Sequence, residues 1–185
     1  MDILILGWWL IMENCSVEND VIVYIISGPC GVGKSTVSKE VAQRIRRSVL
    51  LVGDDLLHVY QGYEARWEER LSLTWTNILS VTRNFIRNGW NVVIDFVVED
   101  ELAWFIQELD DMSVTLYYIV LIADENTLLE RLRRRGNPEI AERSLFLLHK
   151  LKGLNTNNGF LYDTTGREVR EIAQDVLSSK FFRIL

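Results

Sequence analysis

The sequence is poor in the residues that build disulfide scaffolds, cysteine metal sites and proline-rich linkers. It has two cysteines, two histidines and two prolines in 185 residues. Cys15 and Cys30 are too few for a disulfide framework, so a reducing, cytoplasmic setting is the simpler expectation. An excess of basic residues is also missing. The net charge of −6 argues against non-specific binding to a nucleic-acid backbone, and we expect no nucleic-acid partner.

A long hydrophobic run is missing as well, because crossing a bilayer takes about 20 apolar residues. The first eleven residues, MDILILGWWLI, are apolar, and the polar stretch 13–20 follows them. No Lys or Arg precedes this run and no small-residue cleavage site follows it, so we expect neither a signal peptide nor a membrane partner. We interpret residues 1–20 as an N-terminal extension, either a start-site artefact with Met12 as the true start or a loose tail. An added strand, a packing arm and a membrane-surface anchor are the alternatives.

The residues that are present suit one globular domain, with 48% apolar and 25% charged side chains. From residue 21 onward, short β-branched runs alternate with longer stretches of helical periodicity. The expected strands are 21–27, 48–52, 91–98, 114–122 and 160–163, with a terminal strand conceivable at 181–185. The expected helices are 34–47, 64–88, 101–109, 124–135, 139–152 and 167–177. This alternation predicts an α/β fold in which a parallel sheet is covered on both faces by helices, within one domain at 21–185.

The segment between the first expected strand and the first expected helix has a phosphate-binding pattern. GPCGVGKST, residues 28–36, fits G-x-x-x-x-G-K-[ST], and its glycines let backbone N–H groups wrap around a phosphate. The following helix adds its N-terminal dipole. Lys34 would reach terminal phosphate oxygens, and the Ser35 hydroxyl would ligate Mg²⁺. The predicted nucleotide-binding residues here are Gly28, Pro29, Cys30, Gly31, Val32, Gly33, Lys34, Ser35 and Thr36.

With this segment, the chain resembles the P-loop kinase-like superfamily, in particular small-molecule kinases of the gluconate-kinase, shikimate-kinase and chloramphenicol-phosphotransferase type. The similarity runs from about Val21 to Leu177. It implies a three-layer, doubly wound parallel sheet with a helical lid, and ATP and Mg²⁺ as cofactors. The implied reaction moves the γ-phosphoryl group of ATP to a hydroxyl of a small molecule.

An acidic pair follows the second expected strand, where ligands gather in open α/β sheets. A carboxylate at this point can accept the proton of an attacking hydroxyl. GDDLLH, which begins at residue 53, resembles the GD-x-x-H stretch of gluconate kinases with one extra residue before His58. We predict Asp54 as the catalytic base or substrate clamp, with Asp55 as the next candidate. The alternatives are that the pair caps the following helix and that His58 is a surface or packing residue.

A further acid ends the third expected strand. Asn91-Val-Val-Ile-Asp95 has the form of a Walker-B element, which holds Mg²⁺ through water. We therefore predict Ser35 and Asp95 as the metal-site residues. The alternative for Asp95 is an aspartate that caps a turn at the end of a strand.

Five arginines lie within 13 residues around a Gly-Asn-Pro break, at positions 131, 133, 134, 135 and 143. Guanidinium groups bind phosphate oxygens bidentately and stack on adenine. Related kinases carry such arginines in their lids, often spaced R-x-x-x-R, as Arg131 and Arg135 are here. We predict Arg135 and Arg143 as phosphate ligands and Arg131 as a neighbour of the adenine. The alternative is a solvated face, which should account for at least two of the five.

The loop Asp163-Thr-Thr-Gly166 resembles the D-T-[ST] loop that flanks adenine in shikimate-kinase-like folds, and Thr165 is the predicted contact. An ordinary N-cap of the last helix is the other interpretation, and the two are compatible. In the stretch 64–88, Trp67 and Trp75 are spaced two helical turns apart. Tryptophans in this pattern are more typical of a core than of a stacking platform.

Two other functions compete with that of a kinase. A GTPase-like switch would use residues 163–166 as D-x-x-G, but they lie near the C-terminus and the chain has no N-K-x-D guanine reader. An ATPase coupled to a partner protein, or a toxin-like kinase of a peptidoglycan sugar, is the other alternative. We expect ATP and a small-molecule hydroxyl acceptor as partners. The sequence indicates neither the acceptor nor the oligomeric state.

Overall fold

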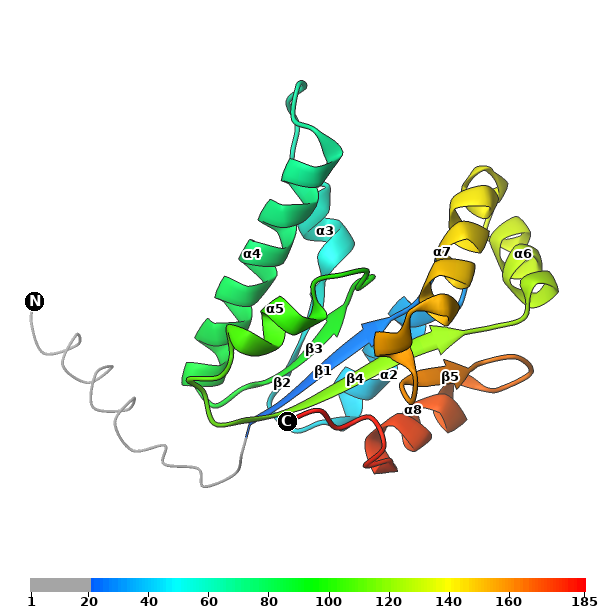
Figure 1. Ribbon diagram of the computed structural model, residues 1–185. Coiled ribbons are helices and arrows are strands. Elements are labelled where there is room, and N and C mark those ends of the chain that lie inside the picture. Colours follow the sequence, from blue (N-terminus) through cyan, green and yellow to red (C-terminus); the bar gives the residue numbers. More distant parts are fainter. Residues whose placement is uncertain (1–20) are drawn as a thin grey trace, which may run out of the picture.

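A parallel sheet forms the centre of the computed structural model, which describes residues 21–185 (Figure 1). The predicted N-terminal extension, residues 1–20, lies outside the described residues. The strands are β1 (Val21–Ser27), β2 (Ser48–Val52), β3 (Asn91–Asp95), β4 (Val114–Ile122) and β5 (Leu161–Asp163), in the order β2-β3-β1-β4-β5. The chain leaves β1 toward β2 and β3 on one side and reaches β4 and β5 on the other. This reversal opens a crevice at the carboxyl ends of the strands.

Helices cover both faces of the sheet, which confirms the predicted three-layer α/β fold. They are α2 (Lys34–Arg44), α3 (Gly53–Leu57), α4 (Trp67–Arg87), α5 (Leu102–Gln107), α6 (Glu125–Arg134), α7 (Ala141–Gly153) and α8 (Val169–Ser178). Two short 3-10 helices, η1 (Pro138–Ile140) and η2 (Asn155–Asn157), flank α7. None of the helices within residues 21–185 combines the length and the apolar character needed to cross a membrane.

The central strand is buried on both faces, which explains why its sequence is a nearly continuous apolar run. Val23 and Ile25 point into a core shared with α4 and α5. Tyr24 and Ile26 point into the opposite core, which α2 and α8 complete. Alternate side chains of one strand therefore hold two helical layers in place above and below the sheet.

The bounds of several expected elements differ from the structure, and three differences are informative. The third strand ends at Asp95 rather than at 98, because the N–H of Val98 donates to the Ser27 hydroxyl, 2.9 Å away, instead of continuing the ladder. The long helix begins at Trp67 rather than at 64, since Glu64 has a positive φ of 83°. The C-terminal segment forms one antiparallel bridge, between Tyr117 and Arg183, and no terminal strand.

An aromatic cluster fixes α4 against the loop that leaves β3. Trp75 is 2% exposed, and its ring lies 5.3 Å from Phe96 and 5.7 Å from Phe105 between centroids. A Cβ on Gly53 would overlap the Phe96 ring, so the start of α3 is equally close to this cluster. Trp67 is 47% exposed, so the core interpretation is correct for one of the two tryptophans only.

We expect Trp75→Ala to lower the free energy of unfolding by about 3–5 kcal/mol, because it removes a buried indole ring that packs on Phe96 and Phe105. Trp67→Ala is the matched control on the same helix and should cost about 1 kcal/mol or less. Urea unfolding followed by circular dichroism measures both. Equal losses in the two variants would contradict the packing described here.

Candidate active site

The predicted phosphate cradle is a tight loop between β1 and α2, closed by a close approach to the neighbouring strand. A Cβ on Gly28 would overlap the carbonyl oxygen of Leu121 in β4, so only glycine fits there. Gly33 has a φ of 108° and directly precedes α2, and no atom lies within 4 Å of the place where its Cβ would be. The loop is therefore packed against the sheet on one side and open on the other, at the N-terminus of an 11-residue helix. Such an arrangement suits an anion.

Lys34 and Asp95 bring opposite charges together beside this loop. Lys34 is 8% exposed, and its ammonium group donates to the carbonyl oxygen of Pro29 at 3.2 Å. Asp95 is 4% exposed, and its Oδ2 has no hydrogen-bond partner among the described residues. Burial raises the pKa of the Asp95 carboxyl, while the Lys34 ammonium and a hydrogen bond from Ser35 oppose this shift. The structure thus brings three of the predicted residues to one point.

The acidic pair that follows β2 also lies near Asp95. The charges of Asp54 and Asp55 raise the pKa of the Asp95 carboxyl further, although less than burial does. Both residues are exposed at the beginning of α3, so either carboxylate is free to meet a ligand from solvent. His58 is exposed, and its Nδ1 lies 2.6 Å from the backbone oxygen of Asp54, which agrees with a surface histidine.

These residues fit a magnesium ion bound together with phosphate. Mg²⁺ prefers oxygen ligands and usually keeps several waters, using one or two protein groups plus substrate phosphates. The Ser35 hydroxyl is exposed beside Asp95, whose second carboxylate oxygen lacks a partner in residues 21–185. Over the same range, no group of three or more acidic, histidine or cysteine side chains could hold a metal without such help.

Arg131 fastens the cradle to the loop that follows β5. Its guanidinium donates to the carbonyl oxygen of Val32 at 2.9 Å and to the backbone oxygen of Thr164 at 3.2 Å. Thr164 is buried, and its hydroxyl donates to the same Val32 oxygen at 3.2 Å. The next residue, Thr165, is exposed and accepts a hydrogen bond from the N–H of Asp124 at 2.9 Å. Of the two predicted adenine neighbours, Arg131 therefore supports the cradle and Thr165 holds the beginning of α6.

A cleft of about 330 Å³ opens beside the cradle, between α2, α6 and the beginning of α8. Its walls include Val32, Arg131, Arg134, Arg135, Arg167 and Ile172. Arg135, a predicted phosphate ligand, lines this cleft, whereas sequence reasoning missed Arg167, which directly follows the Asp163–Gly166 loop. The guanidinium of Arg167 lies 5.3 Å from the centre of the Tyr162 ring. The volume and the mixed arginine and aliphatic walls are typical of a small-molecule site.

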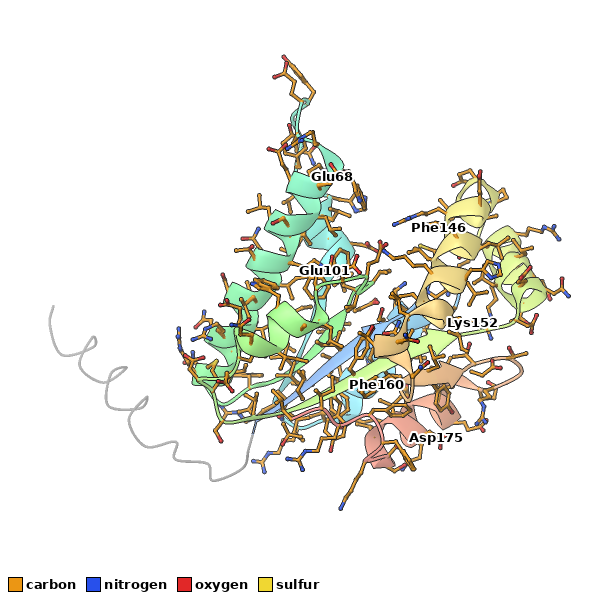
Figure 2. The ribbon with its side chains drawn as sticks, in the orientation of Figure 1. Glu68, Glu101, Phe146, Lys152, Phe160 and Asp175 are labelled. Carbon is orange, nitrogen blue, oxygen red and sulfur yellow. The ribbon has the colours of Figure 1, made fainter. Side chains whose placement is uncertain are left out.

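Arg143 lies apart from this cleft, on α7. Its guanidinium pairs with Glu99 at 2.8 Å and lies 5.3 Å from the ring centre of Phe146, which is labelled in Figure 2. Glu99 also accepts from the ammonium of Lys150 at 2.8 Å. Sequence reasoning missed Glu99 and Lys150, because their partners lie 44 and 51 residues away along the chain. Of the three arginines predicted as nucleotide ligands, Arg131 and Arg135 line the cleft and Arg143 does not.

A second contact joins α7 to the cradle. The hydroxyl of Ser144, which is fully buried, donates to the carbonyl oxygen of Cys30 at 2.6 Å. Leu128, Leu132 and Leu148 form a small core between α6 and α7. Helices α6 and α7 are therefore packed on each other, and each donates one side-chain hydrogen bond to the phosphate loop.

Comparison with known proteins gives one family. Residues 23–154 match the AAA domain family. No curated protein is significantly similar in sequence. The structure is similar to that of the Deinococcus radiodurans tunicamycin resistance protein, with a TM-score of 0.63 and 21% identity over 86% of this chain and 95% of that one.

Two solved kinases are similar as well. Shikimate kinase from Acinetobacter baumannii, in complex with shikimate, has a TM-score of 0.53 and 21% identity over 86% of this chain and 92% of that one. The APS kinase of Mycobacterium tuberculosis, in complex with AMPPNP and APS, has a TM-score of 0.60 and 18% identity over 86% of this chain and 99% of that one. These likenesses confirm the fold of small-molecule kinases.

The raised pKa of Asp95 predicts a specific pH dependence of stability. The folded protein holds a proton on this carboxyl more tightly than the unfolded chain does. The stability that this group contributes is therefore fully present below the ordinary carboxyl pKa and is lost as the pH rises through the raised value. Asp95→Asn should remove this decrease in stability with rising pH. Urea unfolding of both proteins from about pH 4 to about pH 8 measures it.

Asp124 provides a control of opposite sign. Hydrogen bonds from Thr127 lower the pKa of the Asp124 carboxyl, so its contribution to stability is lost as the pH falls. The difference between wild type and Asp124→Asn should accordingly increase with pH. If the difference in stability between wild type and Asp95→Asn also increases with pH, the burial of Asp95 described here is contradicted.

Proposed function

The chain belongs to the AAA domain family, and on that premise we propose that it is an ATP-dependent kinase of a small molecule. Family and fold support nucleotide-dependent phosphoryl transfer in general. The main support for an ATP-dependent kinase is that Lys34, Ser35 and Asp95 lie together beside a glycine-rich loop that is open toward solvent.

The cradle is suited to the charged end of ATP. Phosphoryl transfer asks a protein mainly for positioning and for neutralisation of negative charge. The N–H groups at the start of α2 and the Lys34 ammonium supply positive charge to phosphate oxygens. Ser35 would hold Mg²⁺ directly and Asp95 would hold it through water, and the ion neutralises charge on the β- and γ-phosphates when bound.

The cleft beside the cradle is suited to the nucleoside. Its aliphatic wall includes Val32 and Ile172, and its arginines present planar guanidinium groups. Apolar surface and guanidinium planes both accept the face of an adenine ring. Arg135, which lines this cleft, would bind phosphate oxygens.

We propose that Asp54 is the residue that acts on the hydroxyl of the acceptor. Its carboxylate is exposed at the carboxyl end of β2 and close enough to Asp95 to influence that group electrostatically. An incoming hydroxyl beside it would lose its proton to a carboxylate within reach of the phosphoryl group. The similar APS kinase structure holds AMPPNP together with APS, which shows that such a fold has room for both ligands.

The proposal is tested by titrating the purified protein with Mg·ATP in a calorimeter and then offering hydroxyl acceptors. The acceptors should cover sugars, nucleosides, polyols and antibiotics, with transfer of labelled γ-phosphate as the readout. Binding without transfer to any acceptor, combined with steady ATP hydrolysis, would favour the ATPase alternative. Absence of ATP binding would overturn the proposal altogether.

Lys34→Ala should weaken Mg·ATP binding about 10- to 150-fold, because a hydrogen bond to a charged group contributes about 1.5–3 kcal/mol. Lys39→Ala is the matched control, since Lys39 is exposed on the same helix. Calorimetric dissociation constants compare the two. Unchanged affinity in Lys34→Ala would contradict the cradle assignment.

Asp54→Asn should slow phosphoryl transfer about 10²- to 10⁴-fold while the affinity for Mg·ATP stays within about twofold. Asp55→Asn makes the same charge change one residue away, and it should slow phosphoryl transfer about tenfold or less. If Asp55→Asn is the slower variant, Asp55 is the base. If both variants keep the wild-type rate, neither carboxylate takes the proton.

A further inference from the structure

A separate cavity of about 430 Å³ lies on the face of α4 that packs toward α5. It is lined by Glu68 and Trp75 of α4, by Trp104 of α5 and by Asp100 and Glu101, which precede α5. Figure 2 shows Glu68 high on α4 and Glu101 lower, where α5 begins. The cavity is distinct in its lining residues from the arginine-rich cleft beside the cradle.

The charge of this cavity has one sign. Three of its lining side chains are carboxylates and none is a lysine or an arginine. Glu68 makes no hydrogen bond or ion pair within residues 21–185. Asp100 is 3.4 Å from the Lys150 ammonium, but its side chain is 79% exposed and that lysine is closer to Glu99. The walls are therefore only partly neutralised and would repel an anionic ligand.

Glu101 accepts the most hydrogen bonds of the three carboxylates. Its Oε2 accepts hydrogen bonds from the N–H groups of Glu99 and Asp100, at 2.9 and 3.0 Å. These bonds hold one carboxylate oxygen in place. A carboxylate has about four acceptor positions, so this group retains capacity for a donor from a ligand.

The aromatic walls point to the same kind of ligand. The Trp104 side chain is 37% exposed, and an indole face attracts a cation that approaches it. Trp75 is 2% exposed and forms the aromatic base of the cavity wall beside Trp104.

The cavity is also connected to the proposed transfer site. Five residues lead from Asp95 to Asp100, and a chain of that length spans at most about 18 Å. The Phe96 ring, directly after Asp95, packs on Trp75 with 5.3 Å between centroids. The cavity wall at Asp100 therefore lies within about 18 Å of Asp95, and the contact of Phe96 with Trp75 links the two places.

From these observations we infer that the cavity binds the protonated amine of the phosphoryl acceptor, which makes the acceptor class a cationic amino alcohol such as an amino sugar or an aminocyclitol. The inference rests on the proposed kinase function and deepens it. The carboxylates hold the ammonium group, the exposed indole covers it, and a hydroxyl on the same molecule is left to face Asp54.

Binding without nucleotide tests the cavity independently of catalysis. The full-length protein is titrated with pairs of compounds that differ only in the charged amine: glucosamine against N-acetylglucosamine, and 2-deoxystreptamine against its di-N-acetyl derivative. Gluconate is the anionic comparison. We expect at least fivefold tighter binding of the amine in at least one pair, and no detectable binding of gluconate. Equal binding within both pairs, or tighter binding of gluconate, overturns the inference.

Substitutions in the cavity wall test where the amine binds. Glu68→Gln and Trp104→Ala should each weaken binding of the preferred amine about two- to fivefold, the effect of one partly exposed charge pair or cation–aromatic contact. The control is Glu69→Gln, which makes the same change one residue away on the face of α4 that lines a different cavity. Equal losses in Glu68→Gln and Glu69→Gln would show a general charge effect and overturn the assignment.

The two proposals fail in different ways. If the protein binds Mg·ATP and phosphorylates only neutral or anionic acceptors, the cavity inference is wrong and the kinase function stands. If amines bind in the cavity but Mg·ATP does not bind, the kinase function is wrong, and with it the acceptor role of the cavity.

Discussion

Lys34 and Asp95 are opposite charges that the fold takes out of water at the same edge of the sheet. Isolated burial of either charge would cost several kcal/mol, and their mutual attraction offsets part of that cost. Burial nevertheless outweighs the ammonium in its effect on the Asp95 carboxyl, whose pKa is raised. The pair is thus incompletely satisfied in the free protein. Phosphate oxygens for the lysine and a divalent ion for the carboxylate would complete it.

The surrounding structure holds this pair in position from several elements. Asp95 ends a strand that is hydrogen-bonded on both sides, between β1 and β2. Arg131 on α6 and Ser144 on α7 each donate to a backbone oxygen of the phosphate loop. Helices α6 and α7 are therefore each attached to the phosphate loop by a hydrogen bond from a side chain.

Most of the fold followed from local patterns, and the exceptions have physical causes. The apolar runs of β1 and β4 and the periodicity of α4 and α6 were sufficient to place those elements, because each pattern matches burial on a definite face. The end of β3 was missed, because the apolar residues after Asp95 leave the sheet and enter the core beside Trp75. Their burial is real, but the strand pattern cannot distinguish burial in a sheet from burial in a loop.

The sequence by itself determined the phosphate loop, since its glycines, lysine and serine act within nine consecutive residues of backbone. It also determined the chain order of the five strands and of every α-helix except the short α3, because hydrophobic periodicity is local. Only the tertiary structure decided which arginines border the cleft and that Glu99 pairs with Arg143. It alone brought Glu68 and Glu101 into one cavity, from positions 33 residues apart. Charge pairs and cavities depend on the distance between side chains in space, which local sequence does not encode.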